Sequence, residues 1–308
     1  MVISRDALYE SKLFKKLQVS KEELNSSNIN IIGAKINGLA AMVKALREET
    51  AVAELKKSVD EVIESGLLNN LPQEELSNFK IGDGLYTLAT FTGDEKYKDE
   101  AVKLAAQFNT QKRADKGYFV DKDGAICLCK TYLYQSFFMN YETKNGGKER
   151  YNDIIAQYNC LYKDKFEDTV KTLTQDSTSF FAVASFAAAL VDTMEVMDQM
   201  LYEIYRKMQD YYKDAVKAVL SSDINPIDSE NAACLLFDYA VLKGCRMKAL
   251  QTEKYENKVM GVKDAILTSD LEKDSDEIAG LKAMVYSELI RNREYQDYGR
   301  GKGGALWS

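Results

Sequence analysis

The chain has 308 residues, a formal net charge of −7 and a sequence pI near 5.1, with 41 basic residues spread among 48 acidic ones. Nucleic acid is not favoured as a partner, because phosphate binding needs clustered Lys and Arg and this sequence has no basic block. Histidine is absent, which excludes a Ser-His-Asp triad and any zinc site that uses imidazole, and we expect no metal and no cofactor.

The predicted elements are helices that come in pairs. Two prolines and 17 glycines are too few for many strands bounded by turns, so the sequence predicts an all-α protein. An apolar helix is expected at residues 36–49, 84–91, 129–141, 180–197 and 231–247. A more amphipathic helix follows each of them, at residues 52–68, 92–108, 144–158, 202–216 and 250–267. Each pair therefore predicts a helical hairpin.

The hairpins repeat at a regular interval. Glu-Lys/Arg-Tyr triplets open three of the amphipathic helices, at Tyr97, Tyr151 and Tyr255, and Tyr205 falls near the midpoint of the last interval. These tyrosines are 54, 54 and 50 residues apart. A period of this length predicts stacked hairpins in which the apolar helices are covered on all sides and the amphipathic ones face water.

Two architectures fit such a repeat: an open superhelical solenoid and a closed toroid with an inner and an outer ring of helices. The apolar helices are rich in aromatic residues and neither end shows a polar capping repeat, which favours the toroid, as one domain over residues 1–308. Its central funnel would be lined by the loops before the inner helices, and such concave mouths are common binding sites. These loops are residues 78–84, 117–124, 176–179 and 228–231.

The cysteines and the N-terminus bear on the compartment. Five cysteines make an odd number with no CxxC spacing, which favours small buried thiols in a reducing environment: Cys127, Cys129, Cys160, Cys234 and Cys245. The N-terminus is charged and amphipathic without an apolar core segment, and no stretch is expected to reach transmembrane length. We therefore expect a cytoplasmic protein with no membrane partner.

Four segments follow one another in a characteristic order. They are residues 79–108 with the TGDEKY hairpin, the TQ-R-x-x-x-G-aromatic-aromatic segment from Thr110 to Phe119, residues 128–142, and the ENAACLLFDYAVLKG helix. Together they resemble glycoside hydrolase families 88 and 105, the unsaturated uronyl and rhamnogalacturonyl hydrolases. The resemblance implies an (α/α)6 barrel that cleaves an oligosaccharide with a 4,5-unsaturated uronic acid at its non-reducing end. It also implies one aspartate that protonates the double bond and directs water to it, and a second that holds the sugar.

The resemblance places lysines where the family has these two aspartates. Lys130 falls on one of them, and setting Gly84 on the family's helix glycine places Lys80 on the other. A shift of three residues would place Asp83 there instead, which makes Asp83 the candidate catalytic acid. An ammonium with an ordinary pKa near 10.4 is suited to holding an anion rather than to acid catalysis at neutral pH. Lys80 and Lys130 are therefore candidates for binding a sugar carboxylate; alternatively, Lys130 reaches solvent or pairs with a neighbouring carboxylate.

The remaining candidates are aromatic and acidic. Four aromatic residues could form a flat platform for a sugar ring: Tyr118, Phe119, Tyr132 and Tyr134. Aromatic residues at helical spacing are often core, so Tyr118 and Phe119, which precede the helix, are favoured. Four further acids lie in the loops before inner helices, where turns and helix caps are the alternative roles: Asp121, Asp123, Asp176 and Glu230. Asp192 is expected at the far end of its helix, away from the funnel.

The sequence thus predicts a divergent member of the unsaturated rhamnogalacturonyl or glucuronyl hydrolase group that acts on, or binds, an acidic oligosaccharide or another small anion. The alternatives are a non-catalytic carbohydrate-binding pseudoenzyme and a helical interaction scaffold. The glycine-rich segment 299–304 and Trp307 are expected either to fold over the barrel mouth or to form a frayed tail.

Overall fold

The computed structural model describes residues 5–26, 28–198 and 200–297. The segment from residue 299 to Trp307 lies outside the described residues. Within them, the regular elements are all helices, and the only β pairing is an isolated bridge between Arg113 and Phe119. The all-α prediction is confirmed.

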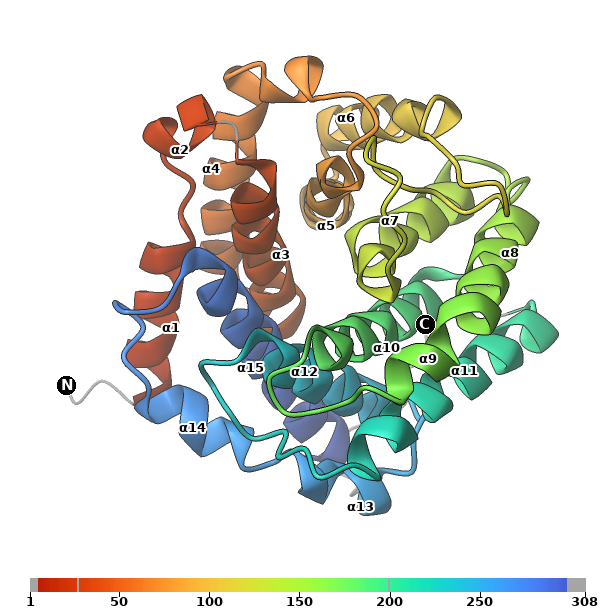
Figure 1. The fold of residues 1–308 in the computed structure, drawn as a ribbon. Helices are drawn as coiled ribbons and strands as arrows, with labels where there is room; N and C mark the ends of the chain where they lie inside the picture. Colours follow the sequence, from red (N-terminus) through yellow and green to blue (C-terminus); the bar gives the residue numbers. More distant parts are fainter. Residues whose placement is uncertain (1–4, 27, 199, 298–308) are drawn as a thin grey trace.

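Six helices of the described chain form an inner ring (Figure 1). They are α3 (Ile29–Leu46), α5 (Gly82–Thr92), α7 (Thr131–Lys144), α10 (Thr178–Val196), α12 (Ala232–Arg246) and α15 (Asp276–Asp297). Each packs against the next in chain order, and α15 packs against α3. The ring therefore closes, as predicted for the toroid and not for the solenoid.

An outer layer surrounds this ring. It contains α1 (Arg5–Leu17), α4 (Glu49–Glu64), α6 (Glu95–Ala105), α8 (Tyr151–Leu161), α9 (Glu167–Val170), α11 (Tyr202–Leu220), α13 (Thr252–Tyr255) and α14 (Val262–Thr268), with the short α2 (Lys21–Ser26) after α1. A π-helical segment, Tyr162–Phe166, joins α8 to α9.

Side-chain patterning explains which helices are inside. Helix α10 is apolar nearly all round and most of its residues are buried, and Ser177 caps it by accepting a hydrogen bond from the Phe180 N–H at 3.1 Å. Helix α11 buries only one stripe, which runs from Met208 to Val219. A helix that is apolar on all sides must be covered, whereas one with a polar face can meet water. The predicted division into inner and outer helices is confirmed.

The two ends of the chain supply one pair of helices that the repeat did not reveal. Helix α15 is the last inner helix and packs against α1, where the Tyr9 and Tyr286 rings lie 5.1 Å apart and the Tyr286 hydroxyl donates to Glu10 at 2.8 Å. Helix α15 has no apolar pattern in the sequence because it buries polar residues, among them Lys282 and Glu288. Its inward face is therefore not an apolar stripe.

Ring closure depends on a glycine. A Cβ atom at Gly280 of α15 would lie 2.5 Å from the Ala34 carbonyl oxygen of α3. Real Cβ atoms do not come this close to a backbone oxygen, so the two helices can approach only where the side chain is absent. A larger residue here would push apart the pair of helices that closes the barrel.

Two inner helices meet the length and composition of a membrane span, contrary to the expectation that no stretch would. They are α3, with a mean hydropathy of 1.3, and the α10 segment, with 1.5. Within the barrel 67% and 72% of these stretches are buried. Their apolar composition is accounted for by the core that they form.

Candidate functional site

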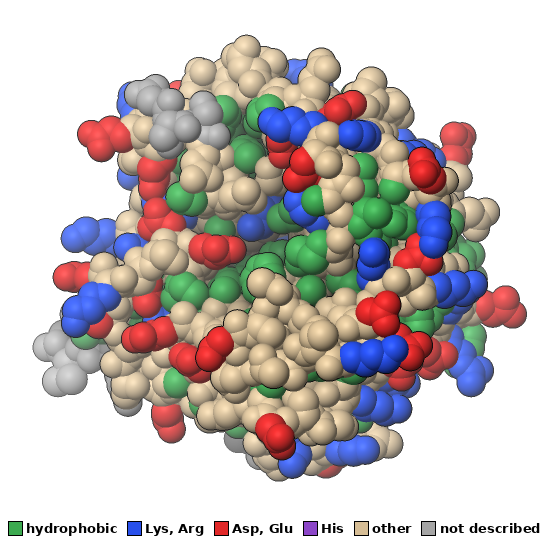
Figure 2. Space-filling view, in the orientation of Figure 1, with side chains coloured by type: hydrophobic (Ala, Val, Ile, Leu, Met, Phe, Trp, Pro, Cys, Tyr) green, Lys and Arg blue, Asp and Glu red, His purple; other side chains and the backbone are tan. Residues whose placement is uncertain are grey.

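The inner helices all begin at one face of the barrel, because outer helices that run in the opposite direction separate each inner helix from the next (Figure 1). The surface of this face is hollowed near its centre (Figure 2). We call this hollow the mouth, and its narrow lower part is lined by Ala34, Lys80, Tyr132, Leu236, Glu277 and Met284, among others. Its place at the start of the inner helices is the one predicted for the funnel.

Lys80 lies in this lower part of the mouth. It belongs to the 3-10 helix Leu76–Ile81 that leads into α5, it is only 7% exposed, and its Nζ lies 5.7 Å from the centroid of the Tyr132 ring. Burial lowers the pKa of the Lys80 ammonium, and the Glu277 carboxylate offsets part of this effect. No carboxylate of the described chain forms an ion pair with it. The sequence placed Lys80 in the funnel, and its side chain does line the mouth.

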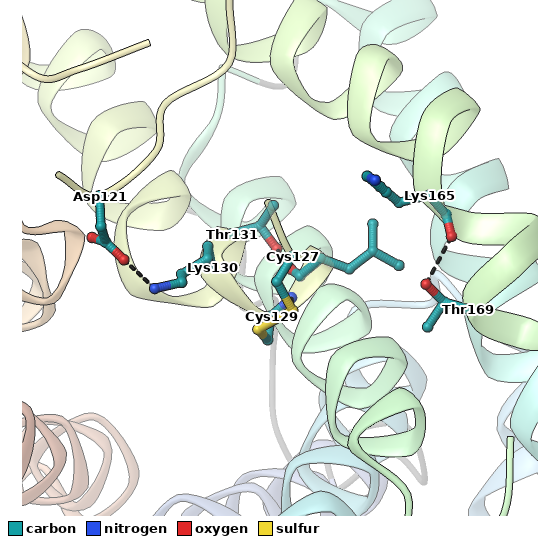
Figure 3. Close-up of a disulfide and its surroundings, with 8 residues drawn as sticks. Asp121, Cys127, Cys129, Lys130, Thr131, Lys165 and Thr169 are labelled. Atoms are coloured by element: carbon teal, nitrogen blue, oxygen red, sulfur yellow. Dashed lines mark hydrogen bonds and ion pairs between the residues drawn. A yellow bond between two sulfur atoms is a disulfide. The ribbon is translucent and has the colours of Figure 1, made fainter. Parts of the chain in front are cut away.

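Lys130 has a different environment. It ends the 3-10 helix Leu128–Lys130 before α7 and forms an ion pair with Asp121 (Figure 3). The same carboxylate accepts a hydrogen bond from the Leu76 N–H at 2.7 Å. Lys130 therefore does not join Lys80 around one ligand, and the alternative in which it pairs with a neighbouring carboxylate is the one that the structure contains.

The aromatic residues proposed as a sugar platform are buried. Tyr118, Phe119 and Tyr134 are 3%, 2% and 1% exposed. The Phe119 ring packs against the Tyr134 ring at 5.6 Å, and both residues donate hydrogen bonds to the Gln157 side chain, at 3.1 and 2.8 Å. These burial values contradict the predicted platform, because no ring face is open to a ligand. The fourth predicted aromatic residue, Tyr132, is the one that lines the mouth.

Tyr132 also closes the bottom of the mouth. Its hydroxyl lies 3.3 Å from the Met284 sulfur, so a contact between α7 and α15 crosses the barrel axis. We call this contact the floor. Both residues also line a second cavity, which lies beneath the floor and has a volume of about 50 Å³. That volume holds a few water molecules and is far below the roughly 300 Å³ of a small-molecule pocket.

Asp83 lines the cavity beneath the floor. It lies in the first turn of α5, and its carboxylate accepts hydrogen bonds from the Ser136 hydroxyl at 2.9 Å and the Asn140 amide at 3.4 Å. Asp192 lies near the C-terminal end of α10, away from the mouth as expected, but it lines this second cavity on the barrel axis.

Asp192 belongs to a network of charged residues that joins three inner helices. Its Oδ1 accepts hydrogen bonds from the Tyr239 hydroxyl at 2.6 Å and from Lys243 at 2.7 Å. Burial raises the pKa of Asp192, and Lys243 and Tyr239 reduce that increase. Lys243 also pairs with Glu195 at 2.6 Å.

The network continues into α15. Arg246 forms bonds of 2.6 and 3.0 Å to the two oxygens of Glu288, and one of 2.7 Å to Glu195, while Arg291 contacts both carboxylates. Burial alone would raise the pKa of Glu288, but the two arginines lower it below its usual value. Each buried carboxylate here has cationic partners, so the network joins helices and leaves no unpaired charge for a ligand.

The loop acids have local roles. Asp123 accepts a hydrogen bond from the Ala125 N–H at 2.8 Å within a turn. Asp176 lies 3.5 Å from the Asn231 amide, and Asn231 itself caps α12. Glu230 donates its N–H to Asp228 at 2.9 Å. Among the described residues, no three or more Cys, Asp or Glu side chains are grouped so that they could hold a metal ion.

A disulfide lies next to Lys130. Cys127 and Cys129 are bonded to each other, and their Cα atoms are 5.2 Å apart (Figure 3). The expectation of five thiols is wrong for these two residues, while Cys160, Cys234 and Cys245 are free. The signal in the sequence is the CxC spacing of these two residues.

The comparisons with known proteins concern the fold. No protein-family model and no curated protein sequence matches the chain. A solved glycoside hydrolase of family 105 from C. acetobutylicum ATCC 824 is similar with a TM-score of 0.66 and 17% identity, over 87% of this chain and 93% of that one. An unsaturated glucuronyl hydrolase specific for heparin gives 0.64 and 12%, over 87% and 86%.

A polysaccharide lyase is also similar, with a TM-score of 0.58 and 11% identity over 90% of this chain and 92% of that one. The chain therefore has the (α/α)6 fold of the glycoside hydrolase family 88 and 105 type. This confirms the fold that the sequence resemblance implied. Identities this low carry the fold and not the reaction.

Proposed function

We propose that this protein binds an acidic oligosaccharide in the mouth of its barrel, with Lys80 pairing to a uronate carboxylate, and that it is not a hydrolase of the type its fold suggests. The proposal keeps the ligand class of the similar structures, one of which is specific for heparin. It differs from their activity in that the sugar is bound and not hydrolysed.

Lys80 carries the proposal because it differs from the other buried lysines. Four lysines of the described chain are buried: Lys35, Lys80, Lys243 and Lys282. Lys35 pairs with Glu23 and Asp276, Lys243 with Asp192 and Glu195, and Lys282 with Asp274. Only Lys80 among them has no carboxylate partner in the described chain, and it lines the narrow lower part of the mouth, which has a volume of about 10 Å³. A buried unpaired ammonium is costly, and an anionic ligand would offset that cost.

Hydrolysis is less well supported because the carboxyl groups are not where a sugar can reach them. Asp121 is held by Lys130 and Leu76, and Asp83 and Asp192 lie beneath the floor. A sugar in the mouth could reach them only past the contact between Tyr132 and Met284. Inverting glycosidases need two carboxyl groups on either side of the bond to be cleaved.

Hydrolysis remains a second candidate on one observation. Asp83 and Asp192 share a cavity, and burial raises the pKa of Asp192, as general acids require. This candidate needs Tyr132 to move away from Met284 so that a sugar can enter.

The first experiment is calorimetric titration with an unsaturated uronyl disaccharide and with the same disaccharide reduced at its carboxyl group. Binding of the acidic sugar and at least tenfold weaker binding of the reduced one are expected, since a hydrogen bond to a charged group contributes about 1.5–3 kcal/mol. Lys80→Met should cause a similar loss. Lys122→Met is the matched control, because Lys122 is an exposed loop lysine paired with Glu75, and it should leave the affinity unchanged.

Two outcomes would reject the binding proposal. Equal affinity for both sugars, or for wild type and Lys80→Met, would show that no carboxylate pairs with Lys80. Loss of the double bond's ultraviolet absorbance in the wild type, abolished in Asp83→Asn with binding retained, would instead establish the hydrolase.

A further inference from the structure

The disulfide between Cys127 and Cys129 joins residues only two apart. A bond that closes so short a loop removes little entropy from the unfolded chain, so it contributes far less to stability than a bond between distant residues. Both sulfurs belong to partly buried residues at the edge of the core, whereas the free Cys234 and Cys245 are fully buried. The disulfide is therefore expected to contribute little to stability and to be accessible to a thiol reductant.

The disulfide lies at the start of a series of contacts that reaches the mouth. Cys127 is the N-cap of the 3-10 helix Leu128–Lys130, and the Cys129 N–H lies 3.2 Å from the Cys127 sulfur. Lys130 is paired with Asp121, and Asp121 holds the Leu76 N–H. Leu76 is the first residue of the helix that carries Lys80. Figure 3 shows the disulfide, Lys130 and Asp121 side by side.

We propose that Cys127 and Cys129 form a reversible redox site that controls the order of this segment. In the oxidised form the bond fixes the turn and holds Lys130 on Asp121. In the reduced form the turn is free, and Lys130, Asp121 and the 3-10 helix Leu76–Ile81 lose a common constraint. The proposal does not depend on the ligand of the mouth.

The redox step requires a dithiol as the reductant. One thiolate of the dithiol attacks a protein sulfur and forms a mixed disulfide, which releases the other protein sulfur as a thiolate. The second thiol of the dithiol then displaces the first protein sulfur. Two protein thiols and one oxidised dithiol result, so two electrons and two protons pass from the reductant to the protein.

The thiol count tests the bond itself. The full-length protein is kept in air or treated with dithiothreitol, unfolded, alkylated and weighed intact. Of the five cysteines, three should be alkylated in the oxidised form and five in the reduced form. Five adducts without dithiothreitol, or three after treatment with it at a concentration that leaves the protein folded, would overturn the proposal.

Hydrogen exchange tests the control of the segment. Amides in residues 76–81 and 121–131 should exchange at least threefold faster in the reduced protein, whereas those of α10 should not change. In the double variant Cys127→Ser/Cys129→Ser, these amides should exchange at the rate of the reduced form, with or without dithiothreitol. In the control variant Cys160→Ser, dithiothreitol should change the exchange rates as it does in the wild type. Equal exchange in the oxidised and reduced wild type would refute the switch even if the disulfide forms.

Discussion

Asp238 of α12 offers a sharp test of the electrostatics of the barrel. The residue is fully buried, and neither carboxylate oxygen has a hydrogen-bond partner. Burial raises the pKa of Asp238 well above its ordinary value. Its folded form therefore holds a proton at pH values where the unfolded chain has released it, and the protein carries an electrostatic cost that Asp238→Asn should remove.

The sign and size of the effect follow from proton linkage. Because the folded state binds more protons than the unfolded state above about pH 4, stability should fall as the pH rises. The slope for this one group is about 1.4 kcal/mol per pH unit until the folded pKa is reached. Asp238→Asn, which cannot ionise, should be more stable than the wild type by about 1–3 kcal/mol at pH 7. The difference should shrink toward pH 4.

Urea unfolding followed by far-ultraviolet circular dichroism at pH 5, 6, 7 and 8 measures this difference. Glu288→Gln serves as the control of opposite sign, since arginines lower the pKa of Glu288 and its charge is stabilising above the unfolded pKa. That variant should lose about 3–5 kcal/mol near neutral pH. A destabilised Asp238→Asn, or a stability difference that does not change with pH, would show that Asp238 has a charge partner and would refute the reasoning.

Three further results are expected. Lys80→Met should increase the free energy of unfolding by about 1–3 kcal/mol near pH 7, because it removes a buried ammonium without a carboxylate partner. The same substitution should weaken sugar binding. Burial lowers the pKa of Lys80, so the gain in stability should decrease as the pH rises through the folded pKa toward 10.5. Calorimetric scans between pH 7 and 10 measure this gain, and a gain that stays constant over the range would contradict the reasoning. Sugar affinity should decrease over the same range as the ammonium loses its proton, which titration at each pH would measure. Gly82→Ala should destabilise the barrel by about 1–3 kcal/mol, because a Cβ there would lie 2.1 Å from the Phe137 ring; unchanged urea unfolding would show that the ring moves freely.

The sequence predicted the repeat and the closed ring because these depend on patterns within each helix. Apolar residues on all sides predict an inner helix wherever they occur, as in α10. Helix α15 has no such pattern because charges line its inward face and pair there with α10 and α12. These pairs join residues 42 and 96 positions apart, so no short window of sequence contains them.

The candidate site was predicted in part for the same reason. Lys80 and Asp83 could be placed near the axis because they flank the start of an inner helix. The sequence could not show that these two residues lie in different cavities. The contact between Tyr132 and Met284, which are 152 positions apart, places Lys80 above the floor and Asp83 below it. It also could not show that Asp121 pairs with Lys130, since loop residues carry no periodic signal.

The floor divides the barrel into two parts that differ in how well they tolerate substitution. Below it, the network around Glu195 and Glu288 joins α10, α12 and α15, and a change to any member leaves a buried charge without its partner. Above it, Lys80 has no partner in the described chain to lose. The mouth can therefore change its chemistry without unfolding the barrel, which is consistent with an (α/α)6 fold of the hydrolase type that has Lys80 in its mouth. If the mouth binds an acidic sugar as proposed, substitutions above the floor should weaken binding without destabilising the barrel.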